Sequence, residues 1–357
     1  MGRKPAARGG VGGPRQRAAL LTPLPTVVQA VSRTIDSLHE PPDPGCARLT
    51  LEISRAAGVS DENVSVGGGS VSLLLALLRA LPAPGSEIVM AAAHSEEHAA
   101  LARILKARCV RVPLTADHCQ NLRAMADRVG PRTRAVLLSN PHNPTGTVIP
   151  VRALCEFLTR VPETTPVLLD EEYWDFVRHD DFTPGTELIA RFPHLVVVRS
   201  FSSAHGLAGL GIGYAVSSPH FAGLIQQQSV PCAVSAAGQA AAVASLRAGW
   251  ELRARVDTVI RERERLREGL LALGFDVPPS QAGYLWLPLG ADSMRFALLC
   301  WGSGVDVKTT ESGVSGVRIK ADLCHVTDDV LRAAERYARE AAGMCVLAGH
   351  PSRGEGM

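Results

Sequence analysis

The chain has 357 residues, of which 46% are hydrophobic and 20% are charged, and its net charge is +2. This length suits two domains, and the composition is that of an ordinary globular protein. The small net charge argues against nucleic-acid or membrane partners, and no apolar stretch is long enough to span a bilayer. Because no apolar leader segment follows the basic N-terminus, we expect a cytoplasmic protein. Eight scattered cysteines without CxxC spacing predict no metal site.

Short apolar runs alternate with amphipathic segments through the first two thirds of the chain. Strands are predicted at 63–66, 87–90, 109–112, 135–138, 167–169, 195–198 and 214–216, with helices from residue 71 and over 98–106. This alternation predicts an α/β fold with a mainly parallel sheet and helices on both faces. A long helix over 250–273 and strands at 283–288 and 314–319 then predict a smaller α+β domain.

The element order predicts the limits of the domains. Residues 45–240 are expected to form the large domain, and residues 14–44 together with 241–345 the small one. Residues 1–13 are rich in Gly, Ala and Arg and are expected to be a disordered tail. Residues 346–357 are expected to form a second tail.

A glycine-rich turn lies between the first predicted strand and its helix. The segment Gly67-Gly68-Gly69-Ser70 would place backbone N–H groups at a helix N-terminus, where anions bind, and glycine lets a ligand approach closely. A plain strand–helix turn has the same composition, so this segment alone leaves both interpretations open.

Two further motifs follow predicted strands. Residues 139–146, SNPHNPTG, form a loop made rigid by two prolines, from which Asn143 projects. Residues 167–173, VLLDEEY, end a buried strand with Asp170 and place Tyr173 three residues later. Ligands of open α/β sheets bind at the carboxyl ends of the strands, so both motifs predict polar groups at a ligand site.

In this order and spacing the three motifs resemble those of the class I/II aminotransferases, fold-type I enzymes that use pyridoxal phosphate (PLP), near the histidinol-phosphate aminotransferase branch. The resemblance extends from about Pro23 to Ala341 and implies that family's fold, a homodimer and a small-molecule substrate. It assigns Asp170 to the pyridine nitrogen of PLP and Asn143 and Tyr173 to its phenolic oxygen. It also assigns Gly69 and Ser70 to the phosphate.

The resemblance places the substrate's carboxylate on Arg318. It fails at the segment that carries the family's cofactor lysine. Residues 200–214 read SFSSAHGLAGLGIGY, in which Ser203 takes the lysine position and Gly211 that of a phosphate-binding arginine. Ser95 takes the position of the aromatic residue that stacks on the cofactor. A segment near Pro41 takes that of a tyrosine reaching the partner's phosphate.

These departures imply that PLP is bound weakly and without a covalent bond, or is not bound. Ser202 would still assist Gly69 and Ser70 in holding an anion. We expect Asp170, Tyr173, Ser203 and a histidine, with His205 preferred, to form the catalytic group.

Other candidates for the lost amine stay open. His94, His98 and His142 lie near the predicted site, although a hydrogen-bonded structural histidine is the commoner role. Lys320 is one of four lysines and lies two residues from Arg318 on a predicted strand, which places both side chains on one face.

The main functional expectation is an aminotransferase-family enzyme that acts on a small amino acid or related carboxylate and has diverged from ordinary transamination. One alternative is a functional PLP-dependent aminotransferase that uses another group. A second is a catalytically inactive binding or regulatory subunit.

Overall fold

The structure is a computed structural model that describes residues 22–81, 87–310 and 313–348. The predicted tail at 1–13 lies outside these residues. Within them, no helix is both long enough and apolar enough to cross a membrane.

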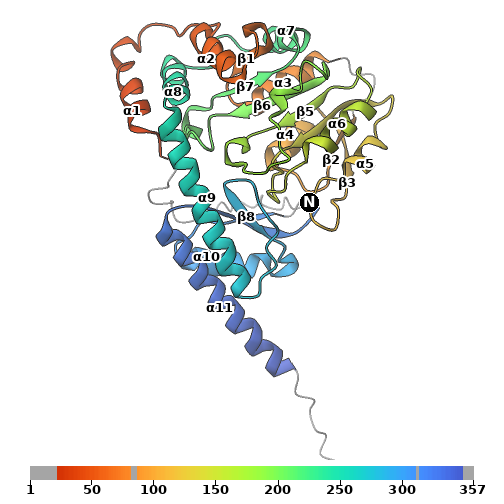
Figure 1. Ribbon diagram of the computed structural model, residues 1–357, viewed down its shortest axis with the longest axis vertical. Coiled ribbons are helices and arrows are strands. Elements are labelled where there is room, and N and C mark those ends of the chain that lie inside the picture. Colours follow the sequence, from red (N-terminus) through yellow and green to blue (C-terminus); the bar gives the residue numbers. More distant parts are fainter. Residues whose placement is uncertain (1–21, 82–86, 311–312, 349–357) are drawn as a thin grey trace, which may run out of the picture.

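A seven-stranded sheet in the order β1-β7-β6-β5-β4-β2-β3 forms the centre of the large domain (Figure 1). Its strands are β1 (Val64–Gly67), β2 (Glu87–Ala91), β3 (Arg108–Val112), β4 (Thr133–Ser139), β5 (Val167–Asp170), β6 (Leu195–Ser200) and β7 (Gly213–Val216). β7 runs antiparallel to both of its neighbours, and the other neighbouring pairs are parallel. The predicted mainly parallel α/β sheet is therefore confirmed.

Alternate residues of the buried strands feed two apolar cores, one on each face of the sheet. In β4, Val136 and Leu138 enter one core while Ala135 and Leu137 enter the other. The first core is closed by α2 (Ala47–Ala57), α5 (Leu122–Ala126), α6 (Val151–Arg160) and α8 (Ala236–Arg247). The second is closed by α3 (Ser70–Ala80), α4 (Glu96–Ile104) and α7 (Pro219–Gln228). Burial on both faces explains why the strands read as continuous apolar runs.

The small domain has an antiparallel sheet in the order β8-β10-β9. Its elements are β8 (Tyr284–Leu287), β9 (Lys308–Thr310), β10 (Gly316–Lys320), α10 (Ser293–Gly302) and α11 (Cys324–Ala348). The long helix α9 (Gly249–Ala272) runs from the large domain into the small one, where Leu266 and Leu270 enter its core (Figure 1). Short 3₁₀ turns cover Ile35–Ser37, Asp61–Asn63, Trp174–Phe176, Gly185–Glu187, Ala208–Leu210 and Gly290–Asp292.

The N-terminal segment packs differently from our expectation. Leu24 and Val27, at the start of α1 (Pro25–Ser32), are buried in the core of the large sheet, and α1 lies against α8. Residues 24–27 therefore add to the core of the large sheet, although we had assigned 14–44 to the small domain. This packing is explained by the apolar residues of α8, which belong to the same core as Val27. At the other end, α11 continues to Ala348, three residues into the predicted tail.

Candidate active site

The carboxyl ends of β4 and β5 place the predicted polar groups at one edge of the sheet. Asp170 ends β5 beside Ser139 of β4, and its carbonyl accepts a 2.8 Å hydrogen bond from the Asn140 backbone N–H. Its carboxylate Oδ2 lies 2.9 Å from Nε2 of the buried His98, on the first turn of α4. Its Oδ1 accepts from the backbone N–H of Glu172 at 3.1 Å. Asp170 is thus oriented by two chain segments.

Ser203 contacts Glu172, which lies two residues after Asp170. Its Oγ donates a 2.8 Å hydrogen bond to Oε1 of Glu172. Both side chains are partly exposed. Desolvation of the carboxyl, followed by the Asp170 charge, raises the pKa of Glu172 from 4.5 to about 7. Glu172 is thus a carboxyl that is held by a serine hydroxyl and is easier to protonate than an ordinary glutamate.

The small domain contributes Arg318 of β10 and Tyr284 of β8. Nη1 of Arg318 donates a 2.9 Å hydrogen bond to Oδ1 of Asn143, which joins the two domains at the proline-rich loop. The guanidinium also lies 4.9 Å from the ring centre of Tyr284, and Tyr284 meets Tyr173 edge to face at 5.0 Å. Arg318 of the small domain and Asn143 of the large domain are therefore in direct contact.

A cavity of about 420 Å³ opens beside these groups. Its lining residues come from the turn between β2 and α4, the start of α4, the proline-rich loop, β9 and β10, namely His94, Ser95, Glu96, Glu97, Asn143, Pro144, Lys308, Thr309, Thr310 and Arg318. Lys308 contributes an exposed amine to this lining, whereas Lys320, the lysine that we had singled out, is exposed at the end of β10 and does not line the cavity.

The predicted anion site has a cradle of close backbone. Gly69 caps α3 at φ +93°, and its carbonyl carbon would lie 2.6 Å from a Cβ placed on Gly213, with the Ser70 nitrogen at 2.5 Å. Only glycine at position 213 permits this approach of β7 to the helix N-terminus. Gly211 lies alongside, with open space where its Cβ would be.

Several predicted residues are engaged elsewhere. Nδ1 of His205 lies 2.7 Å from Oγ of Ser245 on α8, and its ring packs on Phe201. Ser202 receives the hydroxyl hydrogen bond of Ser200 at 2.8 Å. The buried His205 is therefore not among the side chains that the structure brings together around Asp170.

The other histidine candidates differ in what their ring nitrogens contact. Both ring nitrogens of His142 have partners, Thr145 Oγ1 at 2.8 Å and the Ala93 carbonyl at 3.0 Å, and burial lowers its pKa to about 4. Nδ1 of His94 faces the carbonyls of Ala91 and Ala92. Of these candidates, His98 is the one that contacts an ionisable side chain of the site.

Sequence reasoning missed Glu172 and Lys308. Glu172 lies two residues after Asp170 in the motif, but acidic residues are common in such turns. Nothing in the sequence shows that its carboxyl accepts a hydrogen bond from Ser203. Lys308 lay in a segment with no recognised motif, and only the β9–β10 pairing brings it opposite Arg318.

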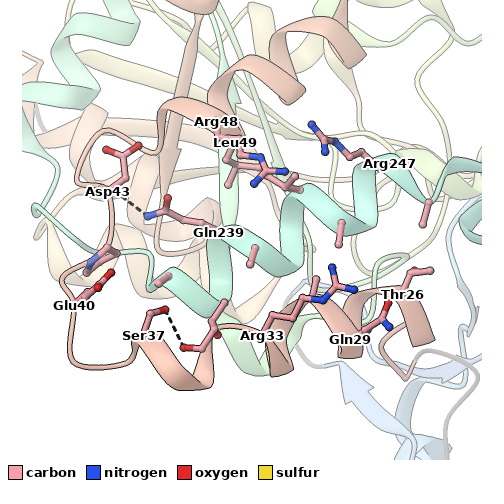
Figure 2. Close-up of a pocket in the computed structure, with 18 of the residues that line it drawn as sticks. Thr26, Gln29, Arg33, Ser37, Glu40, Asp43, Arg48, Leu49, Gln239 and Arg247 are labelled. Atoms are coloured by element: carbon pink, nitrogen blue, oxygen red, sulfur yellow. Dashed lines mark hydrogen bonds between the residues drawn. The ribbon is translucent and has the colours of Figure 1, made fainter.

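A larger cavity lies away from this site. It measures about 760 Å³ and lies between α1, α2 and α8, where Figure 2 shows Arg33, Arg48 and Arg247 around it. None of the residues of the three motifs lines it, although Pro41 does.

Comparisons with known proteins show the family of the chain. Residues 10–336 match the family model described as aminotransferase class I and II. The aromatic amino acid aminotransferase of Thermobifida fusca is 39% identical over 334 residues, covering 92% of each chain. That of Streptomyces coelicolor is 38% identical over 318 residues, covering 89% of this chain and 88% of the relative.

A solved structure is also similar over most of its length. Histidinol-phosphate aminotransferase from Sinorhizobium meliloti, in complex with pyridoxal-5'-phosphate, superposes with a TM-score of 0.82 at 25% identity, covering 90% of this chain and 89% of the other. The Clostridium acetobutylicum histidinol-phosphate aminotransferase has a TM-score of 0.80 at 17% identity, covering 89% and 97%, which supports the fold.

Proposed function

The chain belongs to the class I and II aminotransferases, and from this premise we propose that its pocket binds PLP and an α-amino acid and catalyses amino-group chemistry without a lysine at position 203. The observation that carries the proposal is the hydrogen bond between Arg318 and Asn143 of the two domains, with Tyr284 in contact with both Arg318 and Tyr173. The names of the relatives favour a substrate with an aromatic side chain.

The residues of the pocket fit the cofactor at its pyridine and phosphate ends. PLP, when bound, supplies an electron sink for the carbon that carries the amino group. Asp170, oriented by His98, would hold a proton on the pyridine nitrogen, and the amide of Asn143 would reach the phenolic oxygen. The cradle at Gly69, Ser70 and Gly213 offers backbone N–H groups to the phosphate.

Arg318 would hold the carboxylate of the amino acid. Its guanidinium can form two parallel hydrogen bonds to a carboxylate, and one of its nitrogens is already fixed by Asn143. The nearby Tyr173 and Tyr284 rings would exclude water from the same region. The amino acid would thus be held from the small-domain side of the pocket.

Retention of the cofactor separates this proposal from an ordinary aminotransferase. Ser203 has no amine, so PLP would be noncovalent, and a hydroxyl cannot form the bond that a lysine forms with an aldehyde. Purified protein should take up PLP with a visible absorbance that dialysis removes, and borohydride should leave no pyridoxyl-lysine. PLP that survives dialysis, with a borohydride adduct on Lys308 or Lys320, would show that another lysine binds the cofactor covalently.

A double substitution tests the alignment itself. Ser203→Lys with Gly211→Arg should raise PLP retention more than either change alone, because an amine and a guanidinium would act on one ligand. A charged hydrogen bond from an arginine would contribute about 1.5–3 kcal/mol. Gly211 has φ of +57°, so an arginine there would lose roughly 1 kcal/mol of this to backbone strain. Retention unaffected by the pair would refute the assigned positions.

A second candidate function rests on Ser203 itself. Without an amine there, the same pocket would carry out proton-transfer chemistry on an amino acid or related carboxylate but no complete amino transfer. Incubation with PLP, an aromatic amino acid and 2-oxoglutarate separates the candidates, since only an aminotransferase forms glutamate. A protein that binds none of these ligands would be an inactive binding or regulatory subunit.

A homodimer is the proposed assembly. Pro41 and Trp250 line the cavity of Figure 2, and Trp250 is 71% exposed. Ile35 and Leu38 are also exposed and lie in the same chain segment as the lining residues Thr34 and Ser37. Large apolar groups in such numbers mark interaction surfaces. Sedimentation should show a dimer at micromolar concentration, and Trp250→Ser should weaken that dimer. A wild-type protein that is monomeric at this concentration would contradict the proposal.

A further inference from the structure

Glu172 differs from the other acidic groups near the pocket in its bonding. Within the described part of the chain, no arginine or lysine forms an ion pair with it, and its side-chain partner is the hydroxyl of Ser203 at 2.8 Å. Asp170 is paired with His98. A partly buried carboxyl that lacks a cation binds a proton more readily than one that has it.

The charged and titratable groups that face Glu172 come from every element around it. They are Asp170 of β5, Glu97 of α4, Arg318 of β10, Tyr173 and Tyr284. The two carboxylates disfavour its ionised form, whereas Arg318 and the Ser203 hydroxyl, which donates to Oε1, favour it. Their balance leaves the carboxyl able to change protonation state near neutrality.

We propose that Glu172 is the proton-transfer group of the reaction proposed above, on which this inference rests, and that Ser203 is its positioning residue. The carboxylate takes a proton from the α-carbon of the bound amino acid. The C–H bond breaks, an O–H bond forms on Glu172, and the electron pair stays with the substrate. The same oxygen returns the proton, so that no proton is gained or lost over the cycle.

One contact and one electrostatic effect support this assignment. Arg318 would hold the amino acid by its carboxylate, to which the α-carbon is directly bonded, and the positive charge of Arg318 favours the ionised form of Glu172. Ser203, which the proposed function places where an amine would stand, bonds directly to the Glu172 carboxyl. The proton acceptor is therefore one hydrogen bond away from the position that the lost amine would occupy.

Exchange of the substrate α-hydrogen in D₂O isolates this step from complete turnover. With PLP and phenylalanine present, proton NMR should show loss of the α-hydrogen signal with the wild-type protein. Glu172→Gln should slow this exchange roughly 10²-fold or more, the usual contribution of a positioned base, with PLP affinity unchanged. Glu187→Gln, the same chemical change at an exposed carboxylate of the 3₁₀ turn 185–187, should leave the rate unchanged.

Ser203→Ala supplies a readout that a purely structural role would not move. The Ser203 hydrogen bond lowers the pKa of Glu172, so its loss should raise that pKa and shift the acid limb of the exchange profile to higher pH. Infrared titration of the carboxyl band in the protein without cofactor should show the same displacement, and Glu172→Gln should delete the band.

The outcomes separate the two claims. Wild-type protein that binds PLP and exchanges the α-hydrogen, with Glu172→Gln equally fast, overturns the role of Glu172 and leaves the proposed function standing. Loss of exchange in Lys308→Met with Glu172→Gln unaffected transfers the role to Lys308. A wild type that binds PLP but exchanges nothing also overturns the inference. Failure to bind PLP overturns the proposed function, and the inference falls with it.

Discussion

Glu171 and Glu172 are neighbours in the chain and occupy opposite kinds of site. Glu171 is fully buried, and its Oε2 accepts from Nε and Nη2 of Arg199 at 3.0 and 2.8 Å while its Oε1 accepts from the Gly185 N–H at 2.7 Å. Glu172 is partly exposed and meets a serine hydroxyl. Burial raises the pKa of both carboxyls, but Arg199 and the Gly185 N–H oppose this at Glu171, whereas Glu172 has no cation bonded to it in the described part of the chain. The difference separates a carboxylate that stabilises the fold from one available for chemistry.

Breaking the enclosed pair should have the largest effect on stability. Arg199→Met removes the cation and leaves the Glu171 carboxylate buried without charge compensation, which costs about 3–5 kcal/mol. Urea denaturation at pH 7.5 measures the loss. Arg152→Met, at a side chain that is 87% exposed and 3.7 Å from Glu156, is the matched control and should change stability little. Equal effects of the two changes would contradict the contrast.

Removing the charge of Glu172 should act in the opposite direction. Its pKa rises from 4.5 to about 7 on folding, so the folded state binds the proton more tightly and the wild type loses stability as pH rises through this window. Glu172→Gln should therefore be more stable than the wild type at pH 8, by roughly 1–3 kcal/mol, and the gain should shrink towards pH 5. Thermal melts across pH 5–8 test the sign. Glu171→Gln at pH 8 should instead destabilise the protein.

The smallest effect is expected at Ser203. Ser203→Ala removes one neutral donor to a partly exposed carboxyl, which costs about 1 kcal/mol at pH 8. The cost should decline at pH 5, where the carboxyl is protonated and needs the donor less. Denaturation of the protein without cofactor at both pH values measures it, and a cost above that of Arg199→Met would reverse the comparison.

The sequence was sufficient for the fold because its signals are local. Apolar runs such as 135–138 and 195–198 mark strands that are buried on both faces, and the motifs around Asn143 and Asp170 mark where two of them end. The antiparallel direction of β7 and the packing of Val27 against α8 depend on contacts between distant segments, which no local pattern encodes.

The candidate site was predictable in part for the same reason. Asn143, Asp170 and Arg318 follow from motifs, whereas the pairing of Glu172 with Ser203 depends on two loops approaching across 31 residues. His205 was preferred for its position two residues after Ser203, but the turn directs its ring towards Ser245. Adjacency in the chain does not determine which side of a turn a side chain takes.

Helix α9 has a consequence for how the polypeptide can be divided. Its first turns carry Leu252 against the large core, its middle buries Val256 and Val259 beside Phe176, and its end supplies Leu266 and Leu270 to the small core. A cut before α9 would remove Leu252 from the core of the large fragment. A cut after α9 would remove Leu266 and Leu270 from the core of the small fragment. Proteolysis or gene splitting at this border would thus yield no pair of complete, separately folding fragments.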